Sequence, residues 1–191
     1  MKFSKIKTLI FSDLYRYTKK KNVKTFFKIF LTNSFFRFQV YLRFSKSNNF
    51  LLSFMFRLLK ANLGKKVNVQ LNYNVPIGYG LYIPHGNVVV NSKAIIGNNC
   101  SLLQFASIGA IHNGKSATIG DSVYIGPNVN LVGDINIGSN SVLGAGSVVV
   151  KNIACNKVVV GSPGKAIKDV TDKNTYNDNL CDDSWARKLK E

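Results

Sequence analysis

Residues 119–150 read IGDSVY, IGPNVN, LVGDIN, IGSNSV, LGAGSV and VV, a run of six-residue blocks that each open with an aliphatic residue. A small or aliphatic residue follows four positions later in each block, as Val123 and Ser141 do. A period of six does not match a helix face, which repeats near 3.6 residues. It matches a short strand followed by a tight corner, and three such blocks close one triangular coil of about 18 residues in a stacked array. The aliphatic residues expected to point into this prism are Ile119, Ile125, Leu131, Ile137, Leu143 and Val149.

The same period occurs earlier in the chain, before an interruption at residues 109–118. It runs through Ile77, Ile83 and Val89, slips by one residue, and continues through Ile96, Leu102 and Ile108. Such arrays need about three repeats for stability, and these blocks give roughly four to five coils. The sequence therefore predicts a mainly β protein with a parallel β-helix over residues 65–168.

Residues 1–64 differ in composition and form a basic, aromatic segment. Residues 1–66 hold 16 Lys and Arg against one acid, whereas residues 67–191 hold 10 bases and 8 acids. Of the 22 aromatic residues, 15 also lie before residue 67. Apolar residues at helical spacing predict two or three helices, with Asn48 or Asn49 as a cap and Gly64 as the last C-terminal stop. These apolar residues include Phe27, Phe30, Leu31, Leu51, Met55, Leu58 and Leu59.

Residues 169–191 read as a polar tail in which Asp182 or Asp183 caps a short last helix through Trp185. The three cysteines are widely spaced and form no CxxC pair, which fits reduced thiols in a cytoplasmic protein. The longest clearly apolar run, residues 50–56, is far shorter than the roughly 20 residues of a membrane span. We therefore expect a cytoplasmic protein that does not cross a bilayer.

The chain resembles the hexapeptide-repeat acyltransferases, and within them the branch that includes serine acetyltransferases and capsule or exopolysaccharide O-acetyltransferases. The resemblance covers roughly residues 30–168. It implies a left-handed β-helix, acetyl-CoA as the acyl donor without a metal, and a homotrimer with active sites between neighbouring prisms. The matching pieces are SFFRFQVYLRFSKS, IGYGLYIPHG, AIIGNNCSLLQFASIG, IGDSVYIGPNV, IGSNSVLGAGSVVVKNI and VVVGSPGKAI.

Acetyl transfer from a thioester to a hydroxyl needs a base, and histidine suits this role because it titrates near neutral pH. The chain has two histidines, His85 and His112. His85 follows a hexad, where it can project from a corner, and the resemblance places the catalytic histidine there. In relatives an acid fifteen residues earlier orients this ring; here that residue is Gln70, which can accept a hydrogen bond but supplies no charge. His112 lies in the interruption of the repeat, as a substrate or cofactor contact or as a solvent-exposed loop residue.

By resemblance, coenzyme A lies in a groove between two prisms, where narrow corners let its pantetheine arm approach backbone amides. The alternative for the small residues there is plain repeat geometry, because every coil needs them. Lys165 and, with less support, Lys151 are candidates to contact the nucleotide phosphate, against the alternative of solvated surface lysines. The predicted lining residues are Gly109, Ala110, Gly126, Pro127, Gly144 and Ala145.

The predicted acceptor is a sugar hydroxyl in capsular, exopolysaccharide or lipopolysaccharide biosynthesis. Serine acetyltransferases place an Asp directly before the catalytic histidine, where this chain has Pro84. They also have a longer helical N-terminal domain and end in an aliphatic residue, whereas this chain ends Leu-Lys-Glu. L-Serine is the first alternative acceptor, and the amino group of an amino sugar is the second.

The basic segment, residues 1–64, favours a lipid-linked acceptor at the inner face of the plasma membrane. Each lysine near anionic lipid contributes about 1 kcal/mol, and aromatic residues favour the interfacial layer. Packing of a helical core explains the same composition equally well. Nucleic acid is a weaker interpretation, because no binding motif is present. A non-enzymatic scaffold is disfavoured, because it would not explain the histidine at the position of the family's catalytic residue. A metal hydratase is also disfavoured, because it needs three histidine ligands and the chain has two histidines.

Overall fold

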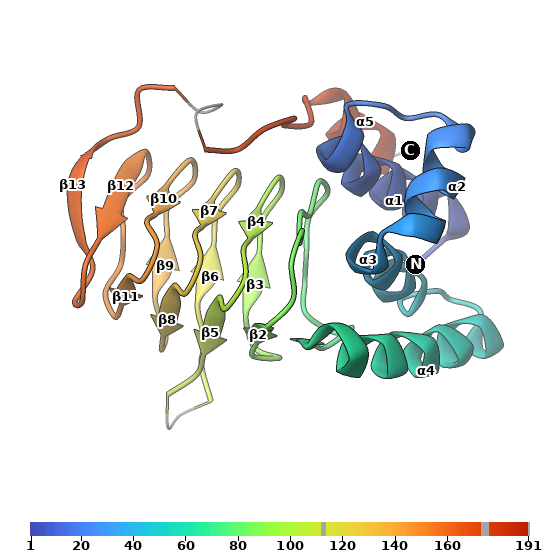
Figure 1. Ribbon diagram of the computed structural model, residues 1–191, viewed down its shortest axis with the longest axis horizontal. Helices are drawn as coiled ribbons and strands as arrows, with labels where there is room; N and C mark the ends of the chain where they lie inside the picture. The colour runs from blue at the N-terminus through green and yellow to red at the C-terminus, as the bar shows by residue number, and fades with distance from the viewer. Residues whose placement is uncertain (112–113, 173–175, 191) are drawn as a thin grey trace.

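The computed structural model describes residues 1–111, 114–172 and 176–190, and it shows helices at one end of a parallel β-helix (Figure 1). Four helices rather than two or three precede the strands. Asn49 caps the fourth helix, since its side chain accepts a hydrogen bond from the Leu52 amide. Gly64 is not the stop: the helix continues to Val67, and Asn68 ends it with a left-handed φ of 53°. The helices are α1 (Phe3–Thr18), α2 (Val23–Thr32), α3 (Ser34–Phe44), α4 (Phe50–Val67) and, after the strands, α5 (Ser184–Lys190).

Three sheets form the faces of the prism, and every strand pair in them is parallel except the last, β12–β13. Sheet A contains β1 (Val69–Leu71), β2 (Val88–Val90), β5 (Ser107–Gly109), β8 (Asn130–Val132) and β11 (Val148–Val149). Sheet B contains β3 (Ile95–Ile96), β6 (Thr118–Ile119) and β9 (Asn136–Ile137). Sheet C contains β4 (Ser101–Leu102), β7 (Tyr124–Ile125), β10 (Val142–Leu143), β12 (Lys157–Val160) and β13 (Lys165–Asp169).

The aliphatic residues that open the hexads line the interior, as expected. From Ile119 to Val149 their exposed fractions lie between 0% and 2%. The expectation for Val89 is wrong, because this side chain is 42% exposed while Val90 is 5% exposed. The slip in the repeat therefore occurs before β2, in the corner of residues 84–87. That corner has one residue more than the corner of residues 103–105 in the next coil, so the inward position moves from 89 to 90.

Polar side chains of the helices satisfy the free edge of the first coil, residues 77–83. Asp13 accepts a hydrogen bond from the Leu81 amide at 2.9 Å, and Gln39 donates to the Leu81 carbonyl oxygen at 2.8 Å. Arg43 donates to the Gly78 carbonyl oxygen at 2.7 Å and forms a buried ion pair with Asp13 at 2.9 Å. Buried backbone groups need such partners. The helical segment is thus the cap of the β-helix, which explains why it buries charged residues.

The tail also packs on the prism, along the corners between sheets B and C. Asn177 is buried and donates to the Ser122 carbonyl oxygen at 2.9 Å. Cys181 donates through its amide to the Asn99 side chain at 3.0 Å. Trp185, in α5, packs against α1 and is 6% exposed. As predicted, Asp182 stands at the start of this helix, where its carboxylate accepts from the Ser184 amide.

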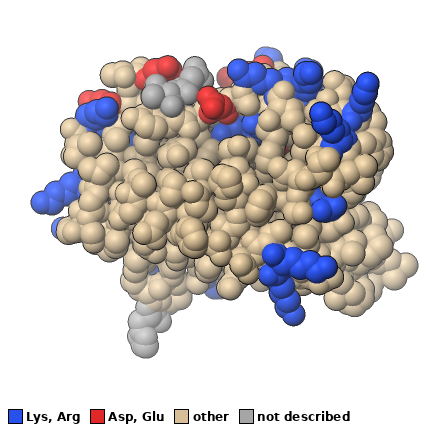
Figure 2. Space-filling model, in the orientation of Figure 1, with Lys and Arg blue, Asp and Glu red and all other residues tan. Residues whose placement is uncertain are grey.

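Lys and Arg side chains gather over the helical half on the face seen in Figure 2. Several apolar side chains of this half are also exposed, which the helical spacing alone did not show. None of the described helices is both long enough and apolar enough to traverse a lipid bilayer. The exposed apolar residues of α2 and α4 include Phe27, Leu31, Leu51, Phe54, Met55 and Leu58.

Candidate active site

His85 stands in the first corner between sheets C and A. Its side chain is exposed, as the sequence predicts for a corner residue. The ring contacts Phe35 of α3 edge-on, with 6.4 Å between ring centroids. Among the residues that the structure describes, no side chain or backbone group forms a hydrogen bond with this ring. With respect to the described residues, both nitrogens of the imidazole are therefore open to a ligand.

The corners between sheets C and A of successive coils stack along one edge of the prism, which we call the His85 edge. Its turns are residues 84–87, 103–105, 126–128 and 144–146. Each turn contains one residue in the left-handed region, and the last is a glycine. These residues are Asn87, Phe105, Asn128 and Gly146, with φ of 58°, 63°, 55° and 73°. The three-residue turns repeat regularly, so the four-residue turn that carries His85 is the irregular one.

A cavity of about 480 Å³ lies next to the corner that carries His85, and His85 itself is not one of its lining residues. Pro84 and Gly86, the two chain neighbours of His85, line it together with Phe35. The end of α4 supplies Lys66, Val67 and Asn68, and the α2–α3 junction supplies three polar side chains. Gly86 must be glycine here, because a Cβ would collide with the Val67 carbonyl oxygen. The close approach of α4 thus fixes the wall beside the histidine.

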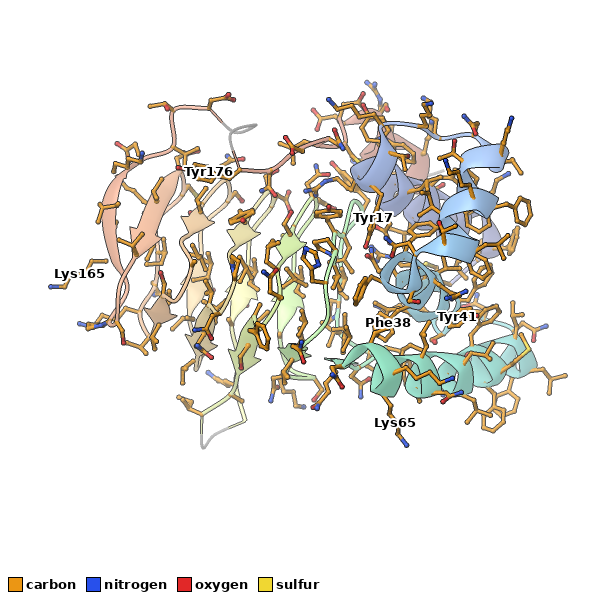
Figure 3. All side chains as sticks on the ribbon, in the orientation of Figure 1. Tyr17, Phe38, Tyr41, Lys65, Lys165 and Tyr176 are labelled. Atoms are coloured by element: carbon orange, nitrogen blue, oxygen red, sulfur yellow. The ribbon has the colours of Figure 1, made fainter. Side chains whose placement is uncertain are left out.

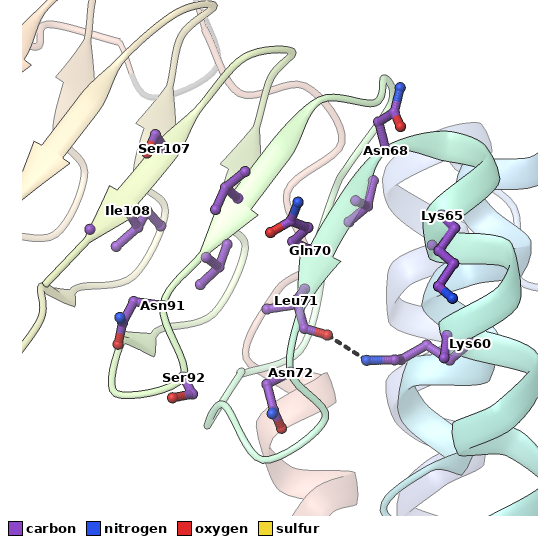
Figure 4. A pocket seen from close by; sticks show the side chains of 16 residues that line it. Lys60, Lys65, Asn68, Gln70, Leu71, Asn72, Asn91, Ser92, Ser107 and Ile108 are labelled. Atoms are coloured by element: carbon purple, nitrogen blue, oxygen red, sulfur yellow. Dashed lines mark hydrogen bonds between the residues drawn. The ribbon is translucent and has the colours of Figure 1, made fainter.

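Gln70 lies on the wall of a second, larger groove of about 730 Å³ between α4 and sheet A (Figure 4). It is exposed, and its backbone pairs with Val89, four residues after His85. Within residues 1–111 no hydrogen bond joins Gln70 to the His85 ring. Its proposed orienting role stays a prediction.

Two of the predicted corner glycines are explained by stacking of the coils. A Cβ on Gly126 would lie 2.6 Å from the Leu143 carbonyl oxygen, and one on Gly144 would lie 2.7 Å from Val160 Cγ1. Both contacts are too close, so the repeat itself requires glycine at these positions. Gly109 is different, because a Cβ there would meet only the Leu131 carbonyl oxygen, at 3.6 Å. Its glycine leaves open space beside the backbone.

The predicted donor-binding residues divide between two edges of the prism. Gly126, Pro127, Gly144 and Ala145 lie on the His85 edge. Lys165, which pairs with Val160 at the start of β13, extends this edge at its far end and points away from the prism (Figure 3). The His85 edge spans four strand spacings of about 4.8 Å from the first coil to β12, or roughly 19 Å.

The remaining predicted residues belong to another edge, between sheets A and B. Gly109 ends β5 there and Ala110 follows it, and Lys151 comes after β11. One chain by itself therefore does not bring Lys151 and Lys165 together. His112 lies outside the described residues, so its role stays a prediction.

Sequence reasoning missed the residues that α4 and α3 bring to the site, notably Phe35, Lys60, Lys65, Lys66 and Asn68. Phe35 belongs to the SFFRFQVYLRF piece, but its spacing did not mark it as a neighbour of His85. The lysines looked like part of a general positive charge. Their position depends on the packing of α4 against the first coil, which no local pattern encodes. In the part of the chain described, no group of three or more His, Cys, Asp or Glu could hold a metal ion.

Comparison with known proteins agrees with the repeat. Residues 116–151 match the family model described as bacterial transferase hexapeptide (six repeats). The β-helix carries the hexapeptide-transferase repeat. No curated protein sequence matches the chain.

Solved structures of serine acetyltransferases share this fold. The Neisseria gonorrhoeae enzyme matches with a TM-score of 0.72 and 24% identity, over 91% of this chain and 71% of that chain. The same enzyme in complex with serine matches with a TM-score of 0.67 and 28% identity, over 84% and 68% of the two chains. Isoform 3 from Entamoeba histolytica, in complex with cysteine, matches with a TM-score of 0.69 and 26% identity, over 95% and 64%. The fold is therefore that of the left-handed β-helix acetyltransferases with an N-terminal helical region.

Proposed function

We propose that this protein is an acetyl-CoA-dependent O-acetyltransferase in which His85 is the general base. The observation that carries the proposal is the position of His85, an exposed imidazole in the irregular corner of a regular repeat, whose chain neighbours Pro84 and Gly86 line a cavity. The match of residues 116–151 to the hexapeptide transferases and the likeness to acetyltransferases support it.

In the proposed reaction the open imidazole nitrogen takes the proton from the acceptor hydroxyl as its oxygen attacks the thioester carbonyl carbon. The carbon–sulfur bond then breaks, and the imidazolium returns the proton to the leaving thiolate of coenzyme A. Direct transfer is favoured because burial raises the pKa of the Cys100 and Cys181 thiols to about 12. Neither thiol is a nucleophile near neutral pH. Cys155 is exposed but follows Ile153 of sheet B, away from the His85 edge.

The donor is proposed to lie along the His85 edge, with Lys165 near its nucleotide phosphates. Gly109, Ala110 and Lys151 lie on another edge, so they reach the same donor only from a neighbouring copy. This division supports the homotrimer that is typical of hexapeptide-repeat acetyltransferases. Light scattering should then give about three times the chain mass of 21.2 kDa. A monomer with full activity would contradict the trimer.

The comparisons favour L-serine over a sugar hydroxyl as the acceptor, because the similar structures are serine acetyltransferases. A sugar hydroxyl is the second candidate. Pro84 favours it, since this residue adjoins His85 and has no side-chain charge with which to hold an amino group. Product analysis with L-serine, free sugars, sugar phosphates and amino sugars separates these acceptors and also distinguishes O-acetylation from N-acetylation.

The test of the catalytic assignment is His85→Ala. Loss of a general base costs on the order of 10²–10⁴ in rate, so turnover should fall at least a hundredfold. Circular dichroism and acetyl-CoA binding should stay as in the unmodified protein, because the side chain is exposed. His112→Ala should lose less, because His112 is the weaker candidate of the two histidines. Near-normal turnover in His85→Ala would refute the assignment.

Gln70→Glu tests the orienting role. If Gln70 holds the ring during the reaction, the new carboxylate favours the protonated imidazole. Activity that requires the neutral base should then shift to higher pH, with turnover kept or raised. An unchanged rate and pH profile in Gln70→Ala would show that another group orients His85.

A further inference from the structure

The groove between α4 and sheet A has a cationic and polar lining. Two lysines line it, and none of its lining residues is an Asp or Glu. Amide and hydroxyl side chains supply most of the other polar atoms (Figure 4). They belong to Asn68, Gln70, Asn72, Asn91, Ser92 and Ser107. Such a surface attracts anions and offers hydrogen bonds to hydroxyl groups.

Lys60 is the more buried of the two lysines. Its Nζ donates a hydrogen bond to the Leu71 carbonyl oxygen at 2.7 Å. An ammonium group has three N–H donors, so this bond leaves two of them for a ligand. Burial lowers the pKa of Lys60, which means that the protein has placed this cation where water solvates it poorly. No ion pair among the described residues involves Lys60 or Lys65.

The groove and the cavity next to the His85 corner have one lining residue in common. Asn68 lines both, and Lys66 in the cavity adds a third cation on the last turns of α4. The cavity lining also lacks acidic residues. Gln70, on the groove wall, pairs with Val89. Val89 is the fourth residue after His85, which corresponds to at most about 13 Å of chain. A molecule with a hydroxyl at His85 can therefore extend its other end into the groove.

We propose that this groove binds an anionic group of the acceptor, a carboxylate or a phosphate, through Lys60 and Lys65; the assignment to the acceptor rests on the proposed acetyl transfer at His85. A volume of about 730 Å³ falls in the range of small-molecule sites, roughly 300–1,000 Å³. L-Serine offers the carboxylate and a sugar phosphate offers the phosphate. The anionic oxygen is common to both.

The experiment measures the binding of L-serine, inorganic phosphate and glucose 1-phosphate to the full chain by calorimetry. Unmodified protein, Lys60→Gln, Lys65→Gln and Lys28→Gln are compared. Lys28 is the control, an exposed lysine of α2 outside both linings. A hydrogen bond to a charged group contributes about 1.5–3 kcal/mol, so each groove variant should weaken anion binding roughly ten- to a hundredfold. Lys28→Gln should leave it unchanged.

The outcomes separate the groove from the catalytic proposal. Lys60→Gln can affect folding, because Lys60 bonds to Leu71; the exposed Lys65→Gln then decides. Unchanged anion binding in Lys65→Gln, or no binding of any of the three probes to the unmodified protein, would overturn the anion site. Weakened binding in a protein that transfers acetyl to no acceptor would refute the proposed function and leave the anion site standing. With active protein, a raised KM for the acceptor at constant KM for acetyl-CoA supports the assignment to the acceptor, and the tighter probe identifies the source of the anion.

Discussion

The helical segment and the β-helix bury different kinds of residues. The β-helix interior is filled by aliphatic side chains such as Ile125 and Leu143, which are fully buried. The boundary with the helices instead buries Asp13, Arg16 and Arg43. Each inner coil satisfies its backbone through the coil on either side, whereas the first coil has a neighbour on one side only. The difference teaches that a repeat specifies its own interior but needs a non-repeating partner at its end.

The surfaces of the two regions differ as well. The helical segment exposes large apolar residues on α2 and α4, as Phe54 and Leu58 show at 52% and 58%. Large apolar side chains that lie together on a surface mark an interaction site in many proteins. The exposed apolar residues and the excess of lysine leave two candidates to cover this surface, a neighbouring copy of the chain and an anionic membrane. Three predictions address the difference between the two regions.

The largest expected effect is at the buried ion pair between the two regions. Asp13→Ala leaves Arg43, which is 1% exposed, without its carboxylate. Breaking such a pair costs about 3–5 kcal/mol, because a buried charge stays uncompensated. The free energy of unfolding from urea titration should fall by that amount. Asp134→Ala removes the exposed pair with Lys115 in the β-helix and should cost at most about 1 kcal/mol. Equal losses of unfolding free energy in the two variants would show that the buried ion pair of the cap stabilises the protein no more than an exposed pair does.

A smaller effect is expected at the lysines between α1 and α2, if this end docks on membrane. Lys19 and Lys20 are exposed, and each lysine near anionic lipid contributes about 1 kcal/mol. Changing both to Gln should weaken binding to phosphatidylserine vesicles roughly thirtyfold, and added salt should release the unmodified protein. Changing the exposed Lys93 and Lys168 of the β-helix serves as the control. Deleting residues 1–24 is a poor test, because it removes α1 and with it Asp13 of the cap. Absence of vesicle binding at low salt would leave helical packing as the explanation of the charge.

The smallest effect concerns the corners of the β-helix. Phe105 has a left-handed φ of 63°, and the residue is 57% exposed. The left-handed region costs an ordinary residue about 1–2 kcal/mol, more than glycine loses in chain entropy. Phe105→Gly should therefore raise the free energy of unfolding by about 0.5–1 kcal/mol. Asn128 occupies the same place one coil further on, and Asn128→Gly should change little, because asparagine tolerates this conformation. A loss of stability in Phe105→Gly would show that the ring packs against a partner.

The hexad pattern predicted the interior of the β-helix from Ile119 to Val149. In this region each inward residue follows the previous one after six positions, so the spacing in the sequence identifies it. It failed at Val89, where one additional residue in the His85 corner changed the inward position to Val90. The same additional residue marks the corner that carries the candidate base. A local departure from a repeat is thus more informative about the site than the repeat itself. The sequence also identified the exposed corner position of His85, but not Phe35 beside it.

The sequence alone specified the period of the prism, the inward residues from Ile119 to Val149 and the corner where His85 stands, because strand alternation and tight turns are properties of adjacent residues. Only the tertiary structure decided that α4 continues past Gly64 and lies against the first coil. The packing of α4 on the first coil forms the groove that Lys60 and Gln70 line. The tertiary structure also buries Asp13 and Arg43 against the first coil, and it places the predicted donor residues on two edges of the prism. Such contacts join residues far apart in the chain through burial and hydrogen bonding, and no spacing within one segment specifies them.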